Sequence, residues 1–488
     1  MSKGLPKREN GFSNWYTQIV NNADLADYGP VKGTMVIKPY GFQLWENIKE
    51  SFDKMIKETG HVNAYFPLFI PKSFLAREAE HIEGFAKECA IVTHTRLKSD
   101  EVNGVIVDPD SKLEEELIVR PTSETVIWSM YKKWIQSYRD LPILINQWAN
   151  VVRWEMRTRL FLRTSEFLWQ EGHTAHETKK EAEKETLDIL FLYKKLAEDY
   201  LAIPVITGIK TEAEKFAGAE KTYCIEAMMG DKKALQAGTS HDLGQNFAKA
   251  FDVKFQTKDN REELVWATSW GVSTRLVGAI ILTHGDDKGL RLPPKIAPIQ
   301  VVMIPIFKSQ EQEKIIKIYI QDIIEGLKEH KIRIHEDWTD NTPGFKFNKW
   351  EMKGVPLRIE VGLRDVEKNN IVIARRDTGK KEFLSKIDVV DNIPSLLQDI
   401  QKNLFSQANQ FMNENTHRIK DFDAFKKVIK DGGFVRCGWD GEPKTETKIK
   451  EETKATIRCI PLDENSEGLK CIYTGTIAKH EVIFAKAY

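Results

Sequence analysis

Residues 153–173 read RWEMRTRLFLRTSEFLWQEGH, and this stretch carries the strongest indication of how the chain folds. Four arginines stand within its first eleven residues, and guanidinium groups suit phosphate oxygens because they donate two parallel, charged hydrogen bonds. Toward its end, strand alternation would place Phe167, Trp169, Glu171 and His173 on one face. A buried structural strand has little reason to combine an aromatic wall, a carboxylate and an imidazole. The stretch therefore predicts a strand that lines a binding site; the alternative is a surface strand with solvated charges.

Two shorter motifs place small and hydroxyl-bearing residues next to charged ones. Residues 120–125 read RPTSET, where the Thr122 hydroxyl and the Glu124 carboxylate together can hold a small cationic ligand. The alternative is a helix N-cap, because Thr or Ser followed by Glu begins many helices, and taken alone the cap is the better interpretation. Residues 236–244 read QAGTSHDLG, which lets the backbone approach a ligand closely; an ordinary turn is the alternative.

An arginine at the start of an apolar helix is a further candidate for binding phosphate. Residues 270–275 read WGVSTR, and the apolar stretch that follows ends at Gly285. Arg275 at such a helix start can meet a polyphosphate, whereas the alternative is a surface salt bridge that contributes little. The chain has neither a GxxxxGK[ST] loop nor a GxGxxG turn after a strand, so side chains would have to hold any nucleotide.

The composition is that of an ordinary soluble globular chain. Its 488 residues favour about three domains. Basic and acidic residues number 72 each, so net charge gives no argument for a nucleic-acid partner. No apolar run reaches the roughly 18 to 20 residues of a membrane-spanning helix, and no secretory signal is visible. Five cysteines, none close to another, argue against a disulfide framework. We therefore expect a cytoplasmic protein without a membrane partner.

Hydrophobic periodicity divides the chain into three units. Helices are predicted over residues 41–59 and 179–201, with an extended segment at 62–67. From residue 295 strands and helices alternate, which predicts an α/β unit whose last helix covers residues 395–407. A proline pair precedes this unit and a polar stretch follows it. The predicted units are residues 1–294, 295–407 and 408–488.

The order of the motifs resembles a known family, the class II aminoacyl-tRNA synthetases. Three signature motifs of that class have matches here. The first is a proline after a long helix, Pro67; the second is an Arg-x-Glu followed by a loop and a phenylalanine, Arg153 to Phe167; the third is a Gly-x-x-x-Arg, Gly271 to Arg275. The segments RPTSE, WQEGH and GTSH resemble prolyl-tRNA synthetases specifically. Only 98 positions separate His173 from Gly271, too few for the large editing insertion of the typical bacterial form. The chain therefore resembles the archaeal/eukaryotic-like form.

The resemblance implies both a fold and a reaction. The fold would be an α+β catalytic domain with the antiparallel class II sheet and flanking helices, an α/β anticodon-binding domain and a small α+β C-terminal domain. Proline and ATP would form prolyl-adenylate and pyrophosphate, and the prolyl group would pass to the 3′-terminal adenosine of tRNA(Pro). Mg²⁺ is expected at the pyrophosphate leaving group. A homodimer is expected, formed through the first predicted helix and the Pro67 segment.

The resemblance also assigns roles to residues of the first unit. The proline pocket would be formed by Phe85, Thr122, Glu124, Arg153, Trp169, Glu171, His173 and His241. ATP would be held by Arg153, Glu155, Arg163, Thr164, Phe167, Gln236, Thr239, Ser273 and Arg275. Arg153 and Arg275 would be the catalytic residues, and Arg153 would bridge the carboxylate of proline and the α-phosphate. No side chain would have to act as a covalent nucleophile.

Residues of the second unit resemble the segment that reads the anticodon. The matching stretches are residues 343–351 and 354–365, and Glu351, Arg358 and Arg364 are the candidates for contacts with bases and backbone. The alternative is that these are surface charges between strands.

The third unit departs from the pattern of relatives that hold zinc with four cysteines. Glu442 and Thr474 stand at two of the four ligand positions, beside Cys437 and Cys471, and Cys459 is poorly spaced to replace either. Because structural zinc requires four such donors, we predict no structural metal and a unit held by packing.

Two other functions compete with a working prolyl-tRNA synthetase. A synthetase-like protein that binds tRNA without catalysis would usually lose residues that hold ATP, yet Arg153, Glu155 and Arg275 are present. An enzyme that adenylates a different small amino acid would differ in the proline pocket at Thr122, Glu124, Trp169 or His173, and none of these is changed.

Overall fold

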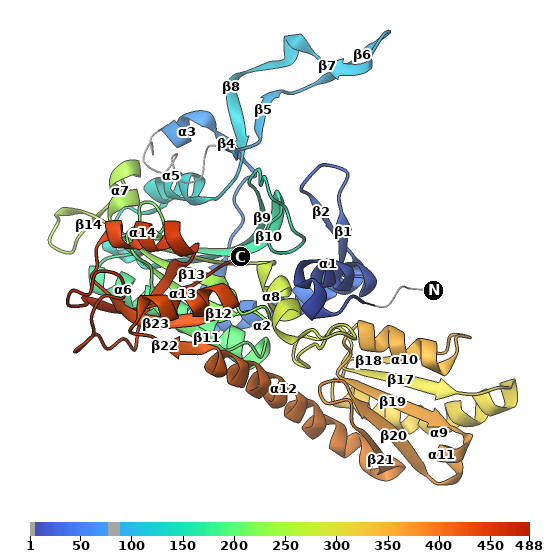
Figure 1. Cartoon of the computed structure of the whole chain (residues 1–488). Helices are drawn as coiled ribbons and strands as arrows, with labels where there is room; N and C mark the ends of the chain where they lie inside the picture. The colour runs from blue at the N-terminus through green and yellow to red at the C-terminus, as the bar shows by residue number, and fades with distance from the viewer. Residues whose placement is uncertain (1–4, 77–87) are drawn as a thin grey trace.

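The computed structural model describes residues 5–76 and 88–488, and one long sheet runs through much of the molecule (Figure 1). The sheet has eleven strands in the order β22-β23-β25-β24-β11-β12-β13-β16-β10-β9-β3. Its middle strands pair antiparallel. They are β9 Ile143–Val152, β10 Glu166–His176, β11 Val205–Ile209, β12 Lys221–Met228, β13 Ala234–Gly244 and β16 Trp266–Ser273. The antiparallel sheet expected for the first unit is confirmed, and the short β3, Val62–Asn63, adds a parallel edge.

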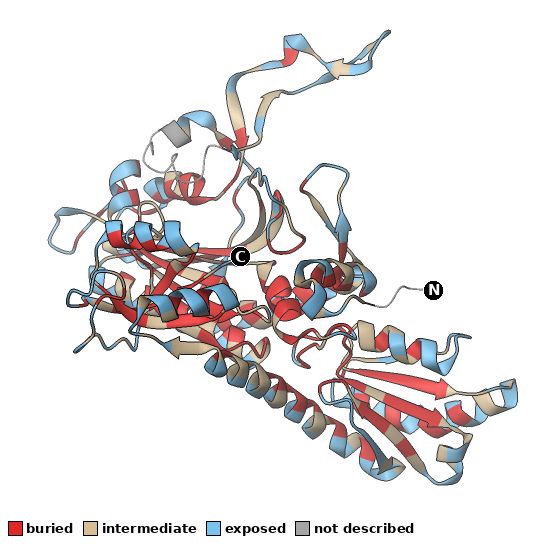
Figure 2. Cartoon of the chain, viewed as in Figure 1, coloured by how far each residue is buried: buried red, intermediate tan, exposed pale blue. Residues whose placement is uncertain are grey.

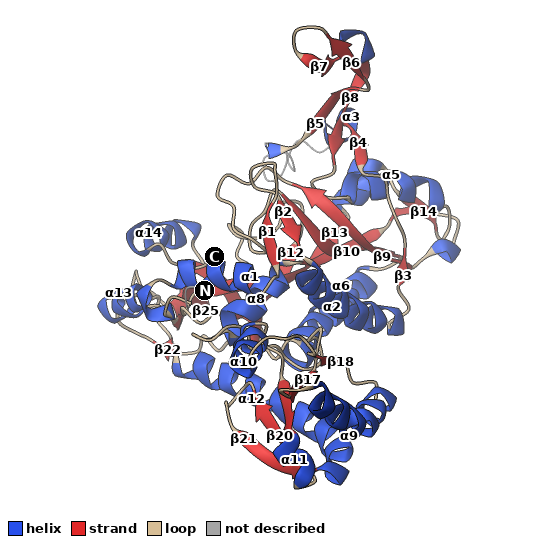
Figure 3. Ribbon diagram, turned by 90° about the vertical axis from the view of Figure 1, so that its right-hand side faces the viewer, coloured by secondary structure: helices blue, strands red, loops and turns tan. Residues whose placement is uncertain are grey.

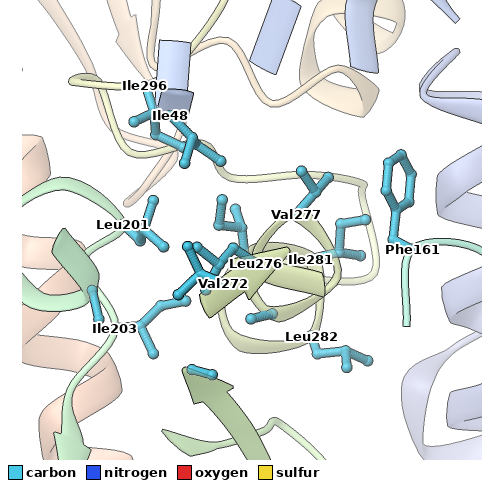
Figure 4. Packing of buried hydrophobic residues seen from close by; sticks show 14 of the residues in the cluster. Ile48, Phe161, Leu201, Ile203, Val272, Leu276, Val277, Ile281, Leu282 and Ile296 are labelled. Atoms are coloured by element: carbon cyan, nitrogen blue, oxygen red, sulfur yellow. The ribbon is translucent and has the colours of Figure 1, made fainter. Parts of the chain in front are cut away.

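Helices cover this part of the sheet and bury two apolar clusters. They are α1 Phe12–Asn22, α2 Pro39–Glu58, α5 Glu124–Trp134, α6 Lys179–Lys195, α7 Asn246–Phe251 and α8 Arg275–His284. One cluster lies under α1, α2, α6 and α8 and the other under α5 and α7. The two predicted helices correspond to α2 and to α6, which continues as a π-helical turn, η5 Leu196–Tyr200. Figure 4 shows how α8 is surrounded: Val277 and Ile281 lie among apolar side chains that include Ile48, Leu201 and Ile296. Helix α8 is therefore fixed in the core along its length.

A second sheet of five strands forms the α/β unit. Its order is β18-β17-β19-β20-β21, with β17 parallel to both of its neighbours and the rest antiparallel. The strands are β17 Val301–Ile306, β18 Ile334–Glu336, β19 Leu357–Gly362, β20 Asn370–Arg375 and β21 Lys381–Ser385. The helices are α9 Gln310–Glu329, α10 Pro343–Met352, α11 Leu363–Glu367 and α12 Val389–Glu414. The predicted alternation is confirmed, whereas α10, α11 and β21 were not predicted.

Helix α12 differs from the helix expected at residues 395–407. It runs from Val389 to Glu414, and one face buries Ile393, Leu397, Ile400 and Leu404, so its apolar periodicity begins before the predicted start. The Asn-rich stretch after residue 407 continues the helix because Met412 is buried again. The expected boundary after residue 407 therefore falls inside α12.

The last unit continues the long sheet instead of forming a separate layer. Its strands are β22 Thr416–Arg418, β23 Phe434–Trp439, β24 Thr456–Pro461 and β25 His480–Ala485, with helices α13 Phe422–Asp431 and α14 Pro443–Thr453. Strand β24 pairs with β11 of the first unit through Gly208 opposite Pro461 and Ile209 opposite Ile460. The first and last units therefore share one sheet.

A long β-arm projects from the first unit, as Figures 1 and 3 show. It is built from β4 Phe69–Pro71, β5 Ile91–His94, β6 Leu97–Asp100, β7 Gly104–Val107 and β8 Lys112–Val119, next to α3 Lys72–Ala76. Most of its residues are exposed or half-buried (Figure 2). Shorter strands complete the fold: β1 Ala26–Tyr28, β2 Met35–Ile37, β14 Lys254–Gln256 and β15 Glu262–Leu264. The arm was not predicted.

Candidate active site

A cavity of about 430 Å³ lies over β10, β13 and β16 of the long sheet. The predicted site residues that line it come from these strands, from the starts of α5 and α8, and from the segments just before α5 and just after β9. They are Thr122, Glu124, Arg153, Phe167, Trp169, Glu171, His173, Gln236, Thr239, His241, Ser273 and Arg275. The alternation predicted for residues 167–173 therefore holds. Phe85 lies outside the described residues.

Glu171 and His173 form a buried ion pair at the floor of the cavity. His173 Nε2 lies 2.9 Å from Glu171 Oε2, and both side chains are about 2% exposed. The other oxygen, Oε1, accepts hydrogen bonds from Ser123 Oγ at 2.5 Å and Gln147 Nε2 at 2.8 Å. Burial alone raises the pKa of Glu171, but the bonds from His173, Ser123 and Gln147 outweigh burial and lower it. Glu171 is therefore a carboxylate.

The pKa values of His173 and His241 are shifted in opposite directions although both side chains are buried. Burial lowers the pKa of His173, but the bond to Glu171 and the charges of Glu124 and Glu171 outweigh burial and raise it. Burial and the nearby His173 charge lower the pKa of His241 to about 3, so His241 is neutral. Its Nδ1 lies 2.9 Å from the Thr222 hydroxyl.

The motif at residues 120–125 both begins helix α5 and lines the cavity. Ser123 is the N-cap position of α5 but makes no capping hydrogen bond with its side chain, because its hydroxyl donates to Glu171 instead. The Thr122 hydroxyl donates to Glu124, and both residues line the cavity. The carboxylates of Glu124 and Glu171 thus give the cavity an anionic end that suits a small cationic group.

Arg153 stands between this anionic end and a second cavity. Its Nε donates to the Pro121 carbonyl at 2.8 Å, and its guanidinium lies 5.6 Å from the ring centre of Phe167 and 5.3 Å from that of Trp169. Burial lowers the pKa of Arg153, and the charges of Glu124 and Glu171 oppose this shift. The Arg153 side chain lines both cavities, so the same guanidinium group faces the first cavity and the second.

The second cavity, of about 280 Å³, contains the remaining predicted ATP residues. Glu155, Arg163 and Thr164 line it and were not on the first cavity, while Arg153, Phe167, Ser273 and Arg275 belong to both. Burial and the charges of Arg163 and Arg153 lower the pKa of Arg275 to about 10, still well above neutrality. Arg153, Arg163 and Arg275 thus lie close together where the two cavities meet, and their charges suit an anionic ligand at that place.

Several lining residues were missed from the sequence. Residues 214–217 form a loop over the first cavity, and Phe216 places its ring 4.6 Å from that of His241. Thr222 and Ser269 also line it. The only feature that marks Thr222 and Ser269 as site residues is their position opposite predicted residues in the sheet; Thr222, for example, pairs with His241. That pairing cannot be predicted before the order of the strands is known.

Two of the three predicted anticodon residues lie together. Glu351 and Arg358 line one small cavity of the α/β unit, which Arg375 and Arg376 also line. The guanidinium of Arg358 stacks 4.2 Å from the ring centre of Phe347. Arg364 is exposed and lies beyond the other end of β19, so it does not share this cavity.

At the positions where zinc-binding relatives carry four cysteines, this chain has two buried thiols, a glutamate and a hydrogen-bonded threonine. Cys437 and Cys471 are both 2% exposed, and burial raises the pKa of the Cys437 thiol. The Thr474 hydroxyl donates to Asp440 at 3.0 Å, as does the Thr445 hydroxyl at 2.9 Å. Within residues 5–76 and 88–488, no three His, Cys, Asp or Glu side chains lie close enough to hold a metal ion.

None of the helices in the described parts of the chain is both long and apolar enough to cross a membrane.

Comparison with known families agrees with this architecture. Residues 106–284 match the tRNA synthetase class II core domain (G, H, P, S and T), and residues 300–396 match the anticodon binding domain. The fold and the site thus define a class II aminoacyl-tRNA synthetase.

Residues 422–488 match the C-terminal domain of prolyl-tRNA synthetase. The proline–tRNA ligase of Cytophaga hutchinsonii is 59% identical over 491 residues, covering 100% of both chains. Those of Phocaeicola vulgatus and Porphyromonas gingivalis are each 58% identical over 100% of this chain and 99% of the relative. The chain belongs to the prolyl-tRNA synthetase family of ATP-dependent proline–tRNA ligases.

Proposed function

We propose that the two joined cavities carry out the activation of proline, and that the prolyl group then passes to tRNA(Pro). The observation that carries this assignment is the continuity of an anionic end, formed by Glu124 and Glu171, with an arginine-lined end through Arg153. An amino acid with a positively charged amine and a nucleotide with negative phosphates would then meet at Arg153, which is the juncture that adenylation requires.

The first cavity would hold proline. Its secondary ammonium group would lie between the Glu124 and Glu171 carboxylates, and the His173 imidazolium would keep Glu171 oriented. Trp169 and neutral His241 would form walls around the apolar ring, with Thr122 beside them. The close support of Glu171 by Ser123 and Gln147 favours this role because a fixed carboxylate loses little entropy on binding.

The second cavity and its shared rim would hold ATP. Arg153 would bridge the proline carboxylate and the α-phosphate and stabilise the charge that develops there. Glu155, Arg163, Thr164 and Phe167 would seat the adenosine part. Ribose and phosphates would be held by Gln236, Thr239, Ser273 and Arg275, with Arg275 as the second catalytic residue.

Mg²⁺ fits this site as part of the nucleotide. Because no three potential ligand side chains cluster in residues 5–76 and 88–488, the ion would be held mainly by phosphate oxygens, as Mg²⁺ commonly is. When bound, it would neutralise charge on the pyrophosphate leaving group.

The α/β unit, residues 295 to the end of α12, would bind the anticodon. Glu351 and Arg358 are the stronger candidates for reading bases, because they share a cavity with an aromatic ring beside it. Arg364, exposed at the other end of β19, would contact the RNA backbone. The catalytic unit would then comprise residues 1–294 and the C-terminal unit the chain after α12. We place the enzyme in the cytoplasm, where tRNA is charged.

A homodimer is part of the proposal. Val62, Tyr65 and Phe69 follow α2 and are 60%, 72% and 47% exposed, an apolar row in the segment expected to form the interface. Light scattering during size exclusion is expected to give twice the mass of one chain, and Val62→Glu should shift the protein toward monomer. A monomeric wild-type chain at micromolar concentration would contradict the dimer.

Two variants test the division of labour. Arg153→Ala should reduce proline-dependent exchange of pyrophosphate into ATP by about 10²- to 10³-fold. Glu351→Ala should leave this exchange unchanged and cost about 1–3 kcal/mol in kcat/KM for tRNA. The exposed Arg261→Ala is the matched control for loss of an arginine. Equal loss of both activities in Glu351→Ala would refute the assignment.

A further inference from the structure

The loop that follows α8 makes a bidentate ion pair with the α/β unit. Asp286 accepts two hydrogen bonds from Arg376, from Nη1 at 2.8 Å and from Nη2 at 2.6 Å. The Arg376 side chain is 7% exposed. Burial alone raises the pKa of Asp286, but the bonds and charge of Arg376 outweigh burial and lower it, so the pair is ionised. Such paired geometry fixes orientation as well as distance.

Arg376 is at the same time part of the small cavity proposed to read the anticodon. It lines that cavity with Glu351 and Arg358, and its Nε donates to the Glu351 carbonyl at 3.1 Å. One guanidinium thus contacts both the residue proposed to read a base and the loop after α8. Asp286 itself does not line the cavity.

The same loop also holds the side chain of Glu351. Lys288 Nζ lies 3.7 Å from Glu351 Oε1, and the two backbones are joined by Leu290 N–H to the Met352 carbonyl at 3.0 Å. A base that hydrogen-bonds to the Glu351 carboxylate would compete with Lys288. RNA binding at Glu351 would therefore favour an arrangement of the loop in which the Lys288 pair is broken.

The other end of this connection is the ATP site. Helix α8 begins at Arg275, which lines both active-site cavities, and ends at His284, two residues before Asp286. The helix is packed in the apolar core (Figure 4). Arg291 Nε donates to the His284 carbonyl at 2.5 Å, and Trp15 Nε1 donates to the Asp286 carbonyl at 2.9 Å. A shift of the loop would consequently be transmitted along a rigid helix to Arg275.

We propose that Asp286 is a positioning residue that couples anticodon binding to catalysis, through Arg376 on one side and α8 on the other. The inference rests on the proposed function, because it requires that Glu351 contact the anticodon. If Asp286 couples the two sites in this way, it is important for discrimination between tRNAs although no atom of Asp286 would touch RNA, proline or ATP.

Asp286→Asn in the full-length enzyme tests the proposal. The readouts are pyrophosphate exchange without tRNA, and kcat/KM for charging a tRNA(Pro) transcript and the same transcript with a substituted anticodon. We expect exchange to stay within about twofold, and the ratio of the two kcat/KM values to fall at least about fivefold, the lower end of ordinary coupling. Arg376→Lys, which keeps the charge but not the two-pronged geometry, should lower the ratio too.

Asp24→Asn is the matched control. It removes a different acidic partner of the α/β unit, the one 3.0 Å from Lys353 Nζ, and should leave the ratio unchanged. An unchanged ratio in Asp286→Asn, with Glu351→Ala defective in charging, would overturn the coupling alone. Normal charging by Glu351→Ala would refute the anticodon assignment and the coupling with it. An equal fall in exchange and charging by Asp286→Asn would show a merely structural role and also overturn the proposal.

Discussion

Glu171 illustrates how a single residue acquires its character from its neighbours. Two side chains and an imidazole direct hydrogen bonds at its carboxylate, and together they outweigh a burial that by itself favours the neutral acid. The sequence predicted that Glu171 and His173 share a face, because strand alternation depends only on local spacing. It could not predict Ser123 or Gln147 as partners, since these come from distant elements.

The pair predicts a pH dependence of stability. The pKa of His173 is raised in the folded protein, so its contribution is fully present below the unfolded value of about 6.5 and is lost as pH rises through the folded value. The difference in melting temperature between wild type and His173→Gln should thus be largest below about pH 6.5 and narrow as the pH rises above that value. Thermal melts over a series of pH values measure it. A difference that widens with rising pH would contradict the ion pair.

At the scale of elements, the packing of β10 against β16 explains why a glycine separates the two site residues. Gly172 lies opposite Trp270 in the sheet. Because residues alternate between the two faces of a strand, Gly172 belongs to the face of β10 that is turned away from the cavity. A Cβ there would stand 2.1 Å from the Trp270 ring. The alternation that places Glu171 and His173 in the cavity therefore depends on a residue without a side chain between them.

Gly172→Ala should destabilise the catalytic unit by about 1–3 kcal/mol, as overpacking of a core commonly does. Chemical denaturation followed by tryptophan fluorescence measures the change. Gly344→Ala in α10 is the control, because a Cβ there meets nothing within 4 Å, and its effect should stay below about 1 kcal/mol. Equal midpoints for the two variants would show that Trp270 moves aside at no cost.

The junction of β11, β12 and β24 carries a buried group of three charges. Glu226 pairs with Lys210 at 2.7 Å and with Arg458 of the C-terminal unit at 3.1 Å, and Glu226 itself is fully buried. Glu226→Gln would leave two buried cations without an anion and should cost about 3–5 kcal/mol. Arg458→Met keeps the pair of Lys210 and Glu226 and should cost clearly less. Denaturation midpoints in the reverse order would contradict this account.

At the scale of the whole molecule, the C-terminal unit completes the catalytic sheet. Local alternation predicted the α/β class of the second unit, whereas the classes of the first and third units were implied by the family resemblance. The sequence could not show that β24 pairs with β11, since this contact joins residues about 250 positions apart in the chain and depends on tertiary packing. The position of Arg364 away from Glu351 was likewise beyond the reach of spacing alone.

The C-terminal unit should fold without zinc. Thr474 donates to Asp440 at a position where zinc-binding relatives would carry a cysteine, and Cys437 packs in an apolar cluster with Phe425 and Val482. Elemental analysis of the purified chain should find far less than one zinc per chain, and a chelator should leave the melting temperature unchanged. About one zinc per chain, lost together with stability on chelation, would contradict the prediction.

The central claim is that the two cavities joined at Arg153 activate proline. Proline-dependent exchange of labelled pyrophosphate into ATP by the purified chain tests it most directly, with alanine and cysteine as comparison substrates. Strong exchange with proline, lost in Arg153→Ala, is the result that this account predicts. A folded wild-type protein that exchanges pyrophosphate with no amino acid would contradict it.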